Sequence, residues 1–277
     1  MSATIMTFYN EKGGVGKTST IAMVGYNLAK MGYRVLLIDY DPQANLTEVM
    51  IKTAGNHSSI VTIQKSLMTA INDGTPINDI RINIMPNLFL IPTASDFYLY
   101  PRYIERMFPN EVDRVMSFST LITDRMRELY DFIFIDVPPT FTITNDAVFY
   151  ACDQMIIMLQ TQIRSFGGAK RVVSYLQKNL IDEFHAKIDI LGVLPVMSKK
   201  KSKIDEETLQ DARDYFQENM FDNVIYLMNR VKNMDKTGIT DKDRWDEIAH
   251  KAFMAVIREM LDRLDKEGDH KEVITNG

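Results

Sequence analysis

The segment from residue 11 to residue 19 constrains the fold of this chain more than any other feature of the sequence. It reads Glu11-Lys12-Gly13-Gly14-Val15-Gly16-Lys17-Thr18-Ser19 and stands between an apolar run, Ile5–Tyr9, and an amphipathic stretch, Lys17–Met31. The run is typical of a β-strand, and the stretch is typical of a helix because its apolar residues recur every three or four positions. Glycines at such a junction indicate a sharp turn that brings the backbone close to a ligand.

A glycine-rich loop that opens a helix is suited to bind phosphate. Its backbone N–H groups can point inward, and the helix start adds unpaired N–H groups and the positive end of the helix dipole. Lys17 can then reach the β- and γ-phosphates of a nucleotide, and the Thr18 hydroxyl can ligate Mg²⁺. A glycine-rich turn without a ligand is the alternative, although both lysines and the threonine at fixed places make an accidental match rare. The predicted nucleotide contacts are Lys12, Gly13, Gly14, Val15, Gly16, Lys17, Thr18 and Ser19.

The rest of the chain alternates short apolar runs with helical patterns, which predicts an α/β fold with a doubly wound, mostly parallel sheet flanked by helices. Further strands are predicted at Val35–Ile38, Leu88–Ile91, Phe132–Ile135, Met155–Leu159 and Ile190–Val196. Helices are predicted at Val115–Leu129, Val172–Leu180, Leu209–Met220 and Trp245–Leu264. In the last of these, we expect the stripe of Trp245, Ile248, Ala252, Val256 and Met260 to pack in the core.

Composition bounds the class of protein. No linker rich in Pro, Gly or Ser divides the 277 residues, so we expect one domain over residues 1–265 and a polar tail over 266–277. The tail and Thr53–Ser59 are expected as loop or frayed end. Cys152 is the only cysteine, which excludes an internal disulfide and a metal site built from several thiolates of one chain. No apolar run approaches the length of a membrane helix, so we expect a cytoplasmic protein without membrane attachment.

The lysine just before the double glycine gives the pattern K-G-G-x-G-K-[ST], the deviant form of the Walker A motif, with Glu11 where the standard form has its first glycine. On this motif the chain resembles the ParA/MinD family of P-loop ATPases. The resemblance implies Mg²⁺-dependent hydrolysis of ATP by a homodimer that encloses the nucleotides. It also implies that Lys12 reaches across the dimer interface to the nucleotide held by the other subunit.

Two aspartates follow the second predicted strand. The segment Asp39-Tyr40-Asp41-Pro42-Gln43-Ala44-Asn45 resembles the family's D-x-D-P-Q-G-N motif, with Ala44 in place of the usual glycine. Carboxylates at the C-terminal end of a central strand point into the crevice where doubly wound sheets bind ligands, so Asp39 can hold a Mg²⁺-bound water. The resemblance implies that Asp41 orients and activates the attacking water. The alternative is that one aspartate caps the next helix.

The strand Phe132–Ile135 ends in Asp136, which is the Walker B pattern. We expect Asp136 to orient water around Mg²⁺, while the two prolines that follow at 138 and 139 stiffen the backbone next to the γ-phosphate. By the resemblance, Gln160–Gly168 matches the loop before the family's next helix, and Met197 and Ser198 stand where the family contacts adenine. The predicted catalytic residues are thus Lys12, Lys17 and Asp41, and the predicted metal ligands are Thr18, Asp39 and Asp136.

Absent features narrow the branch of the family. An iron–sulfur reductase needs paired cysteines, a MinD-type division protein ends in a basic amphipathic membrane helix, and a related tyrosine kinase has a tyrosine-rich tail. The DNA-partitioning branch remains, in a form without an N-terminal helix-turn-helix domain. It implies a nucleoid-associated ATPase that binds DNA nonspecifically, is stimulated by a centromere-binding, ParB-like partner, and segregates a plasmid or chromosome. The alternatives are a related ATPase that positions another cargo on the nucleoid, a MinD-like division-site ATPase, and a metabolic P-loop ligase.

A DNA-binding protein with a net charge of -5 must concentrate its cations on one face. Two clusters are candidates: the run of Lys199, Lys200, Lys201 and Lys203, and the set of Arg230, Lys232 and Lys236 ahead of the final helix. The family usually places this surface in its C-terminal part, which favours the second set. The alternative for both clusters is an ordinary solvated surface.

Overall fold

The computed structural model describes residues 2–57, 61–161, 163–198 and 203–275, with only the backbone described for 163–165, 197–198, 203–204 and 267–275. It contains one eight-stranded sheet in the order β3-β4-β2-β5-β1-β6-β7-β8. All neighbouring strands run parallel except β3 and β4 at one edge. The strands are β1 (Thr4–Tyr9), β2 (Val35–Asp39), β3 (Ile82–Met85), β4 (Leu88–Ile91), β5 (Phe132–Asp136), β6 (Gln154–Gln160), β7 (Asp189–Ser198) and β8 (Ile225–Tyr226).

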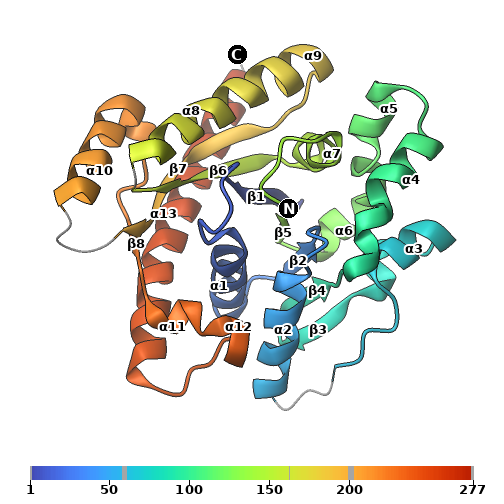
Figure 1. The fold of residues 1–277 in the computed structure, drawn as a ribbon, viewed down its shortest axis with the longest axis horizontal. Coiled ribbons are helices and arrows are strands. Elements are labelled where there is room, and N and C mark those ends of the chain that lie inside the picture. The colour runs from blue at the N-terminus through green and yellow to red at the C-terminus, as the bar shows by residue number, and fades with distance from the viewer. Residues whose placement is uncertain (1, 58–60, 162, 199–202, 276–277) are drawn as a thin grey trace.

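Helices cover both faces of the sheet (Figure 1). The long ones are α1 (Lys17–Lys30), α2 (Asn45–Asn56), α8 (Ile163–Leu176), α10 (Lys203–Phe216) and α13 (Arg244–Thr275). The shorter α-helices are α3 (Leu67–Asp73), α4 (Tyr100–Met107), α5 (Glu111–Met116), α6 (Asp124–Leu129), α7 (Ile143–Ala151), α9 (Asp182–Phe184), α11 (Asn229–Lys232) and α12 (Met234–Thr237). Single 3₁₀ turns lie at Ile77–Ile80, Ser95–Leu99, Ser119–Leu121 and Gln217–Asn219, and a π-helical turn at Gln177–Ile181 extends α8.

Two hydrophobic cores form because successive strand residues point to opposite faces of the sheet. In β1, Ile5 and Tyr9 belong to the core under α7 and α8, whereas Met6 and Phe8 belong to the core under α1, α2 and α13. The doubly wound, mostly parallel sheet predicted from the sequence is therefore confirmed. The sequence analysis missed the two edge strands β3 and β8, which are short.

The helix predicted over Val115–Leu129 is wrong. The structure has α5, a 3₁₀ turn and α6 in this region, because hydroxyl side chains bond to nearby backbone groups and compete with helical hydrogen bonds. The Ser117 hydroxyl donates to the Arg114 carbonyl at 2.7 Å, and the Thr123 hydroxyl accepts from the backbone N–H of Met126 and starts α6.

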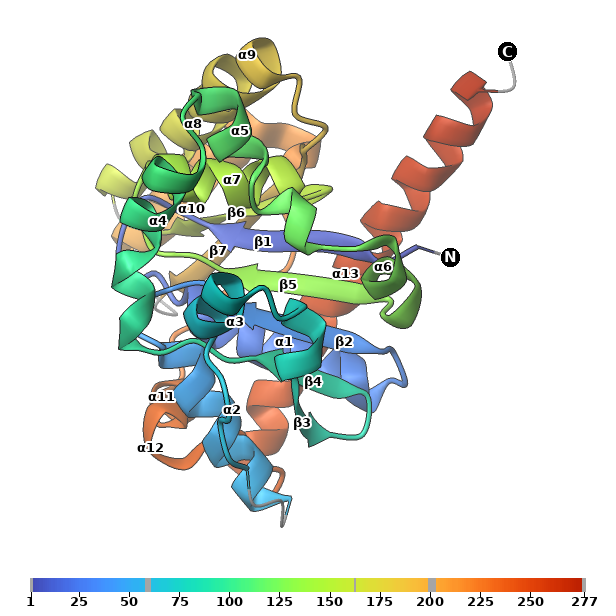
Figure 2. The same ribbon diagram turned by 90° about the vertical axis from the view of Figure 1, so that its right-hand side faces the viewer.

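The loop predicted at Thr53–Ser59 is also wrong for residues 53–56, which form the last turn of α2. Residues 58 and 59 lie outside the described part of the chain. Thr53 is buried and accepts a hydrogen bond from the backbone N–H of Ile239 at 2.9 Å. Tertiary packing therefore overrides the polar local composition. Likewise the backbone of α13 continues through the expected frayed tail to Thr275 and projects from the body (Figure 2).

The prediction that one stripe of the last helix is buried is confirmed near its middle and wrong at its start. Val256 and Met260 are fully buried, but Trp245 is 67% exposed and Ile248 is 41% exposed. The buried face of α13 instead begins with Asp246, whose carboxylate turns inward to pair with Arg230. This ion pair fixes which side of α13 faces the core, and Trp245 lies on the solvent-exposed side.

Candidate nucleotide site

The phosphate loop lies at the edge of the sheet where the parallel strands end, between β1 and α1. Figure 2 shows the arrowheads of β1 and β5 on the same side of the molecule, and in Figure 1 the loop lies near the middle of that face. Gly14 has φ 72° and Gly16 has φ 88°, values that favour glycine over any other residue. Gly16 also precedes the first residue of α1, so the unpaired N–H groups of the helix start open onto the loop.

Lys17 is buried at the first turn of α1, with its side-chain ammonium 3.5 Å from the carbonyl oxygen of Asn10. Burial lowers the pKa of Lys17, and the charges of Asp136 and Asp41 oppose that shift. Among the described residues, this ammonium has one long hydrogen-bond contact and lies near carboxylates, so it is positioned to receive an anion. This placement fits the predicted phosphate contact.

Asp39 and Asp136 face each other in register at the ends of the adjacent strands β2 and β5. Asp39 is fully buried and accepts hydrogen bonds from the Thr47 backbone N–H at 2.8 Å and the Thr47 hydroxyl at 2.7 Å. Burial raises the pKa of Asp39 to about 7 despite these hydrogen bonds. Burial and the neighbouring Asp39 raise the pKa of Asp136 to about 8, although the Thr18 hydroxyl and Lys17 act in the opposite direction.

The donor set fits a divalent cation. Neither carboxylate oxygen of Asp136 has a hydrogen-bond partner of normal geometry among the described residues, although both oxygens are buried. Burial of such groups is costly unless a cation or hydrogen bond compensates, and carboxylate and hydroxyl oxygens are ligands that Mg²⁺ prefers. The predicted ligands Thr18, Asp39 and Asp136 are thus brought to one place, where a bound Mg²⁺ would satisfy the unpartnered oxygens.

Asp41 lies beside a hollow of about 460 Å³ that reaches from the β2 end to the segment after β5. Its carboxylate accepts a hydrogen bond from the backbone N–H of Gln43 at 2.9 Å, and among the described residues no other charged side chain lines the hollow. Pro138, Pro139 and Thr140 form part of its wall. The hollow gives room for water next to Asp41, as the predicted role of this residue requires.

Asn145 holds the segment after β5 in place, and the sequence analysis did not identify it. Its side-chain amide nitrogen donates to the carbonyl oxygens of Pro138 at 2.8 Å and Thr140 at 2.6 Å, and the Tyr9 hydroxyl donates to the same Thr140 oxygen at 2.9 Å. Asn145 is fully buried in the first turn of α7. The available signal was an asparagine within a buried, mainly apolar helix, which requires a specific hydrogen-bond partner.

Lys12 is exposed on the loop, with its ammonium 2.9 Å from the side-chain oxygen of Gln160 at the end of β6. The backbone N–H of Lys12 donates to the Asn10 side chain at 2.9 Å. Glu11, which replaces the first glycine of the standard motif, forms an ion pair with Arg171 of α8. These contacts fasten the start of the loop to the β6–α8 side of the molecule.

A second, narrow hollow of about 30 Å³ adjoins the phosphate loop on the side of β7 and β8. The predicted base contacts Met197 and Ser198 end β7, and their side chains lie outside the described part of the chain. The residues that line the hollow include several that sequence reasoning missed, because β8 and α11 are too short to give a periodic pattern. They are Val15, Gly16, Ser19, Thr20, Val196, Ile225, Tyr226, Leu227, Met228, Val231, Lys232 and Phe253.

The structure separates the predicted DNA contacts. Lys232 and Lys236 are exposed on α11 and α12, whereas the Arg230 side chain is only 17% exposed and pairs with the buried Asp246. Lys199, Lys200 and Lys201 lie outside the described residues, and the side chain of Lys203 does too. DNA contact by Arg230 stays a prediction, and its charge is already balanced within the fold.

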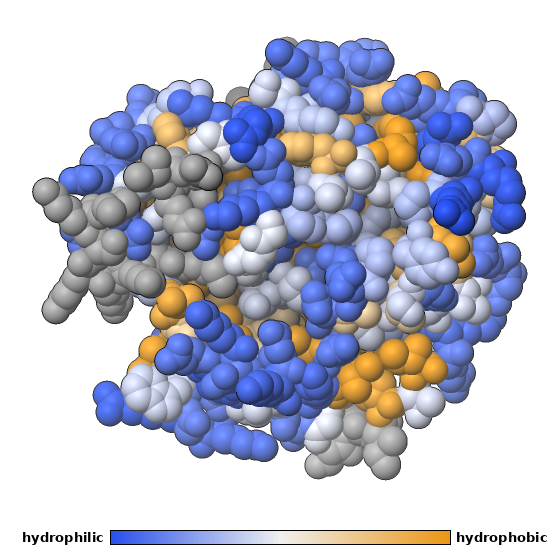
Figure 3. All heavy atoms as spheres, in the orientation of Figure 1, coloured by the Kyte–Doolittle hydropathy of each residue, from blue (hydrophilic) through white to orange (hydrophobic). Residues whose placement is uncertain are grey.

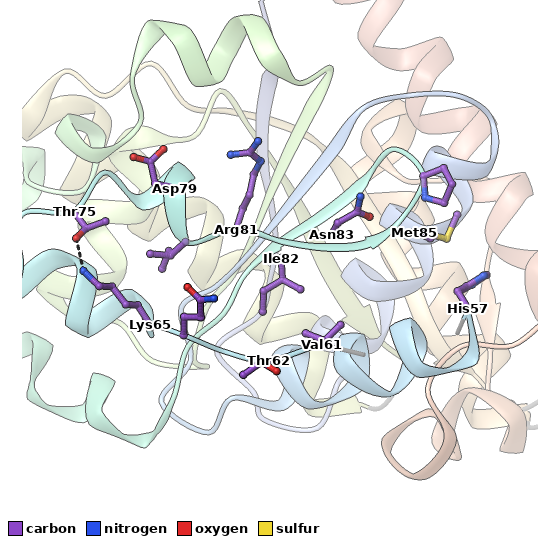
Figure 4. A pocket seen from close by; sticks show the side chains of 13 residues that line it. His57, Val61, Thr62, Lys65, Thr75, Asp79, Arg81, Ile82, Asn83 and Met85 are labelled. Atoms are coloured by element: carbon purple, nitrogen blue, oxygen red, sulfur yellow. Dashed lines mark hydrogen bonds between the residues drawn. The ribbon is translucent and has the colours of Figure 1, made fainter. Parts of the chain in front are cut away.

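A larger hollow of about 1240 Å³ lies away from these residues, against the edge strand β3 (Figure 4). Its walls come from the segment Val61–Lys65 and from β3 with its flanks, and they include His57 and Arg81. Neither the phosphate loop nor the carboxylates Asp39 and Asp136 contribute to it. Its size therefore carries no weight in locating the nucleotide.

The fold and the site define a P-loop nucleotide hydrolase with a lysine ahead of the double glycine. A family model described as "AAA domain" matches residues 3–190, and the chain belongs to this family, within the ParA/MinD group of P-loop ATPases. It is 27% identical over 220 residues to the "Chromosome-partitioning ATPase Soj" of Treponema pallidum, which covers 79% of this chain and 81% of that protein.

Solved structures agree on the fold. The ATP complex of a McdA variant from Cyanothece has a TM-score of 0.78 and 21% identity, covering 94% of this chain and 97% of the other. A putative plasmid partition protein from Borrelia burgdorferi bound to AMPPNP has a TM-score of 0.73 and 18% identity, covering 96% and 100%. Within the described residues, no helix combines the length and apolar character needed to cross a membrane.

Proposed function

We propose that this chain is an ATP-hydrolysing partition protein that forms an ATP-sandwiched homodimer, binds DNA nonspecifically, and segregates a plasmid or chromosome with a centromere-binding partner. The observation that carries the proposal is the pair of buried carboxylates, Asp39 and Asp136, in register beside the ammonium of Lys17. The carboxylate pair lies next to the phosphate loop, where it would help to bind a nucleotide together with Mg²⁺. The partitioning ATPases among the relatives support the branch.

Binding of ATP follows from the loop and its surroundings. Backbone N–H groups around Gly14 and Gly16 would hold the phosphates, and the buried Lys17 ammonium would balance their charge. Thr18, Asp39 and Asp136 would hold Mg²⁺, which when bound neutralises phosphate charge. The base would lie against the narrow hollow between the loop and β8, whose walls are largely apolar.

Hydrolysis requires an oriented water and a fixed wall opposite it. Asp41 would accept a proton or hydrogen bond from water in the adjoining hollow, and the backbone from Pro138 to Thr140 would form the wall, held by Asn145. The Lys12 side chain is exposed, so it would reach another subunit once its contact with Gln160 breaks. ATP would then couple subunit association to turnover.

DNA binding would use exposed cations near the end of the chain, among them Lys232 and Lys236, with Arg230 holding α11 against α13. Phosphate contacts of this kind confer no sequence preference and weaken with salt. Lys232 also lines the hollow proposed for the base, so the nucleotide and DNA would both contact the short segment that contains Lys232. A ParB-like partner would release the protein by stimulating hydrolysis, and the protein would be cytoplasmic and associated with the nucleoid.

The test is a gel-retardation and ATP-turnover experiment with the full chain, a mixed-sequence duplex, and the product of a neighbouring small DNA-binding gene. Retardation should require ATP and Mg²⁺ and fall steeply with salt, and the partner should raise turnover. Lys17→Ala is the matched control, since it should not hold ATP. ATP turnover without DNA binding at low salt would refute partitioning and favour another cargo.

A further inference from the structure

Trp245 is the only tryptophan of the chain and lies on its surface. The residue is 67% exposed, and Ile248, one turn further along α13, is 41% exposed. The indole is not displaced from the core by poor packing, because Ala249, Phe253 and Val256 fill the buried face of the same helix. An exposed large aromatic side chain on an otherwise well-packed helix is a common mark of a contact surface.

Hydrogen bonds and an ion pair hold the start of α13, and with it the backbone of Trp245, in place. The Asp243 carboxylate caps the helix by accepting from the backbone N–H groups of Trp245 at 2.7 Å and Asp246 at 3.0 Å. The carboxylate of Asp246 accepts from the Thr240 hydroxyl at 2.6 Å and pairs with Arg230 of α11. Trp245 therefore belongs to a surface in which α11 and the first turn of α13 are fastened together.

Four cations lie on α11, on α12 and next to or at the start of α13. Among the described residues, no ion pair or side-chain hydrogen bond engages the charged groups of Lys232, Lys236, Lys242 and Arg244, and all four side chains are exposed. Most acidic groups nearby are neutralised or occupied: Asp241 pairs with Lys30, Asp246 with Arg230, and Glu247 with Lys251, while Asp243 caps α13. When the partners Lys30 and Lys251 are included, cations outnumber the acidic groups Asp235, Asp241, Asp243, Asp246 and Glu247 by two, so the surface keeps a small positive excess on a protein whose net charge is -5.

The segments that carry these cations lie together at one end of the molecule. Figures 1 and 2 both place α11 and α12 beside the N-terminal end of α13, and Figure 3 shows hydrophilic side chains over α11 and α12. A surface with several cations around one exposed indole fits a polyanion that also contains planar rings. Nucleic acid has both properties, because phosphates match the cations and bases match the indole.

We propose that Trp245 is a DNA contact, with its indole against the bases or sugars of a groove while Lys232, Lys236, Lys242 and Arg244 bind phosphates on either side. The inference rests on the proposed function and extends it to a named aromatic side chain. A membrane fits less well, because a membrane-binding helix needs a broad apolar face. Here the apolar face of α13 is buried in the core, and only Trp245 and Ile248 remain outside among its described large apolar side chains.

Intrinsic fluorescence tests the contact directly, since Trp245 is the single tryptophan. With ATP and Mg²⁺, a mixed-sequence duplex should quench the emission in proportion to binding measured by gel retardation. Heparin, a polyanion without bases, should bind without comparable quenching. Trp245→Ala should weaken DNA binding about tenfold and Trp245→Phe much less, as expected for loss of one large aromatic contact in the groove. Met107→Ala, which removes another exposed apolar side chain, on α4, should bind as wild type.

The charged part of the surface has its own readout. The double variant Lys242→Ala with Arg244→Ala should reduce the slope of log affinity against log salt by about two, because two phosphate contacts are lost. Unchanged emission at saturating duplex, together with normal binding by Trp245→Ala, would overturn this inference and leave the proposed function intact. Quenching or a blue shift only with vesicles of phosphatidylglycerol and phosphatidylcholine would overturn it in favour of a membrane. Absence of any DNA binding by wild type would overturn both.

Discussion

The side chain of Asn145 donates a hydrogen bond to the carbonyl oxygen of Pro138 at 2.8 Å and so ties helix α7 to the backbone that follows the Walker B strand. The same amide nitrogen holds Thr140 at 2.6 Å. Asn145→Ala removes both donors and leaves two carbonyls with fewer partners, which should cost about 2 to 4 kcal/mol of folding free energy. It should also slow ATP turnover by about ten- to a hundredfold with a much smaller change in KM, because the wall beside the γ-phosphate loses its position.

The matched control for this variant is Asn56→Ala. The Asn56 amide also donates to two carbonyls, those of Thr237 at 2.8 Å and Ile239 at 3.1 Å, but at the far end of α2. It should lose stability in urea without losing turnover once folded. Equal losses of turnover in the two variants would show that Asn145 acts only through overall stability.

Ala44 adopts a left-handed backbone conformation, φ 55° and ψ 27°, just before α2. The family motif that this segment resembles has glycine at this position. A Cβ atom in this conformation destabilises the folded state by about 1 to 2 kcal/mol. Glycine avoids this strain, but its greater freedom in the unfolded chain offsets part of the gain. Ala44→Gly should therefore raise the free energy of unfolding by about 0.5 to 1 kcal/mol in urea titrations. Ala255→Gly, in the regular part of α13, should lower it by about 1 kcal/mol. Destabilisation by both substitutions would contradict the assigned backbone strain.

Asp146 gives the fold a pH dependence. Burial raises the pKa of its carboxyl to about 6 despite the hydrogen bond from Tyr175 at 2.8 Å. Because the folded state holds the proton more tightly than the unfolded state, stability should fall as pH rises from about 4 to about 6, by roughly 2 to 3 kcal/mol. Asp146→Asn should remove this part of the dependence and be the more stable protein at neutral pH. Parallel wild-type and variant curves in urea titrations between these pH values would refute the assignment.

The sequence was sufficient for features that depend on local pattern. Buried parallel strands are continuous apolar runs, and the loop at Gly13 to Lys17 needs specific residue types, so both could be predicted within a residue or two. Features set by tertiary contacts could not. Thr53 is helical because residues from near the other end of the chain pack on it. An asparagine in a buried helix indicates that Asn145 has a hydrogen-bond partner, but the sequence does not identify the carbonyls of Pro138 and Thr140 as that partner. Trp245 follows the helical period of the apolar residues in α13 but is exposed. The buried side of this helix is set by Asp246, whose pairing with Arg230 the sequence does not reveal.

Asp41 should separate ATP binding from ATP hydrolysis. Its carboxylate lines the hollow beside Pro138 and Pro139, whereas Lys17 and the glycine loop, which would hold the phosphates, stay intact in Asp41→Ala. The variant should bind ATP within about twofold of wild type, turn it over at least about a hundredfold more slowly, and accumulate as a dimer. Calorimetry, phosphate release and size-exclusion chromatography in ATP measure the three properties. Wild-type turnover would remove Asp41 from the catalytic set.

Lys12 should act on the nucleotide of the other subunit, and mixed dimers with the Asp41 variant can decide this. Lys12→Gln alone should impair hydrolysis and keep the fold, since the side chain is exposed and the backbone N–H bond to Asn10 remains. In a dimer of Lys12→Gln with Asp41→Ala, the nucleotide bound by the Lys12→Gln subunit still meets an intact Asp41 and receives the lysine of its neighbour. One of the two sites should then be active, so mixing two inactive proteins should restore up to about half of the turnover per heterodimer. If Lys12 acted within its own subunit, each site would lack one group and the mixture would stay inactive.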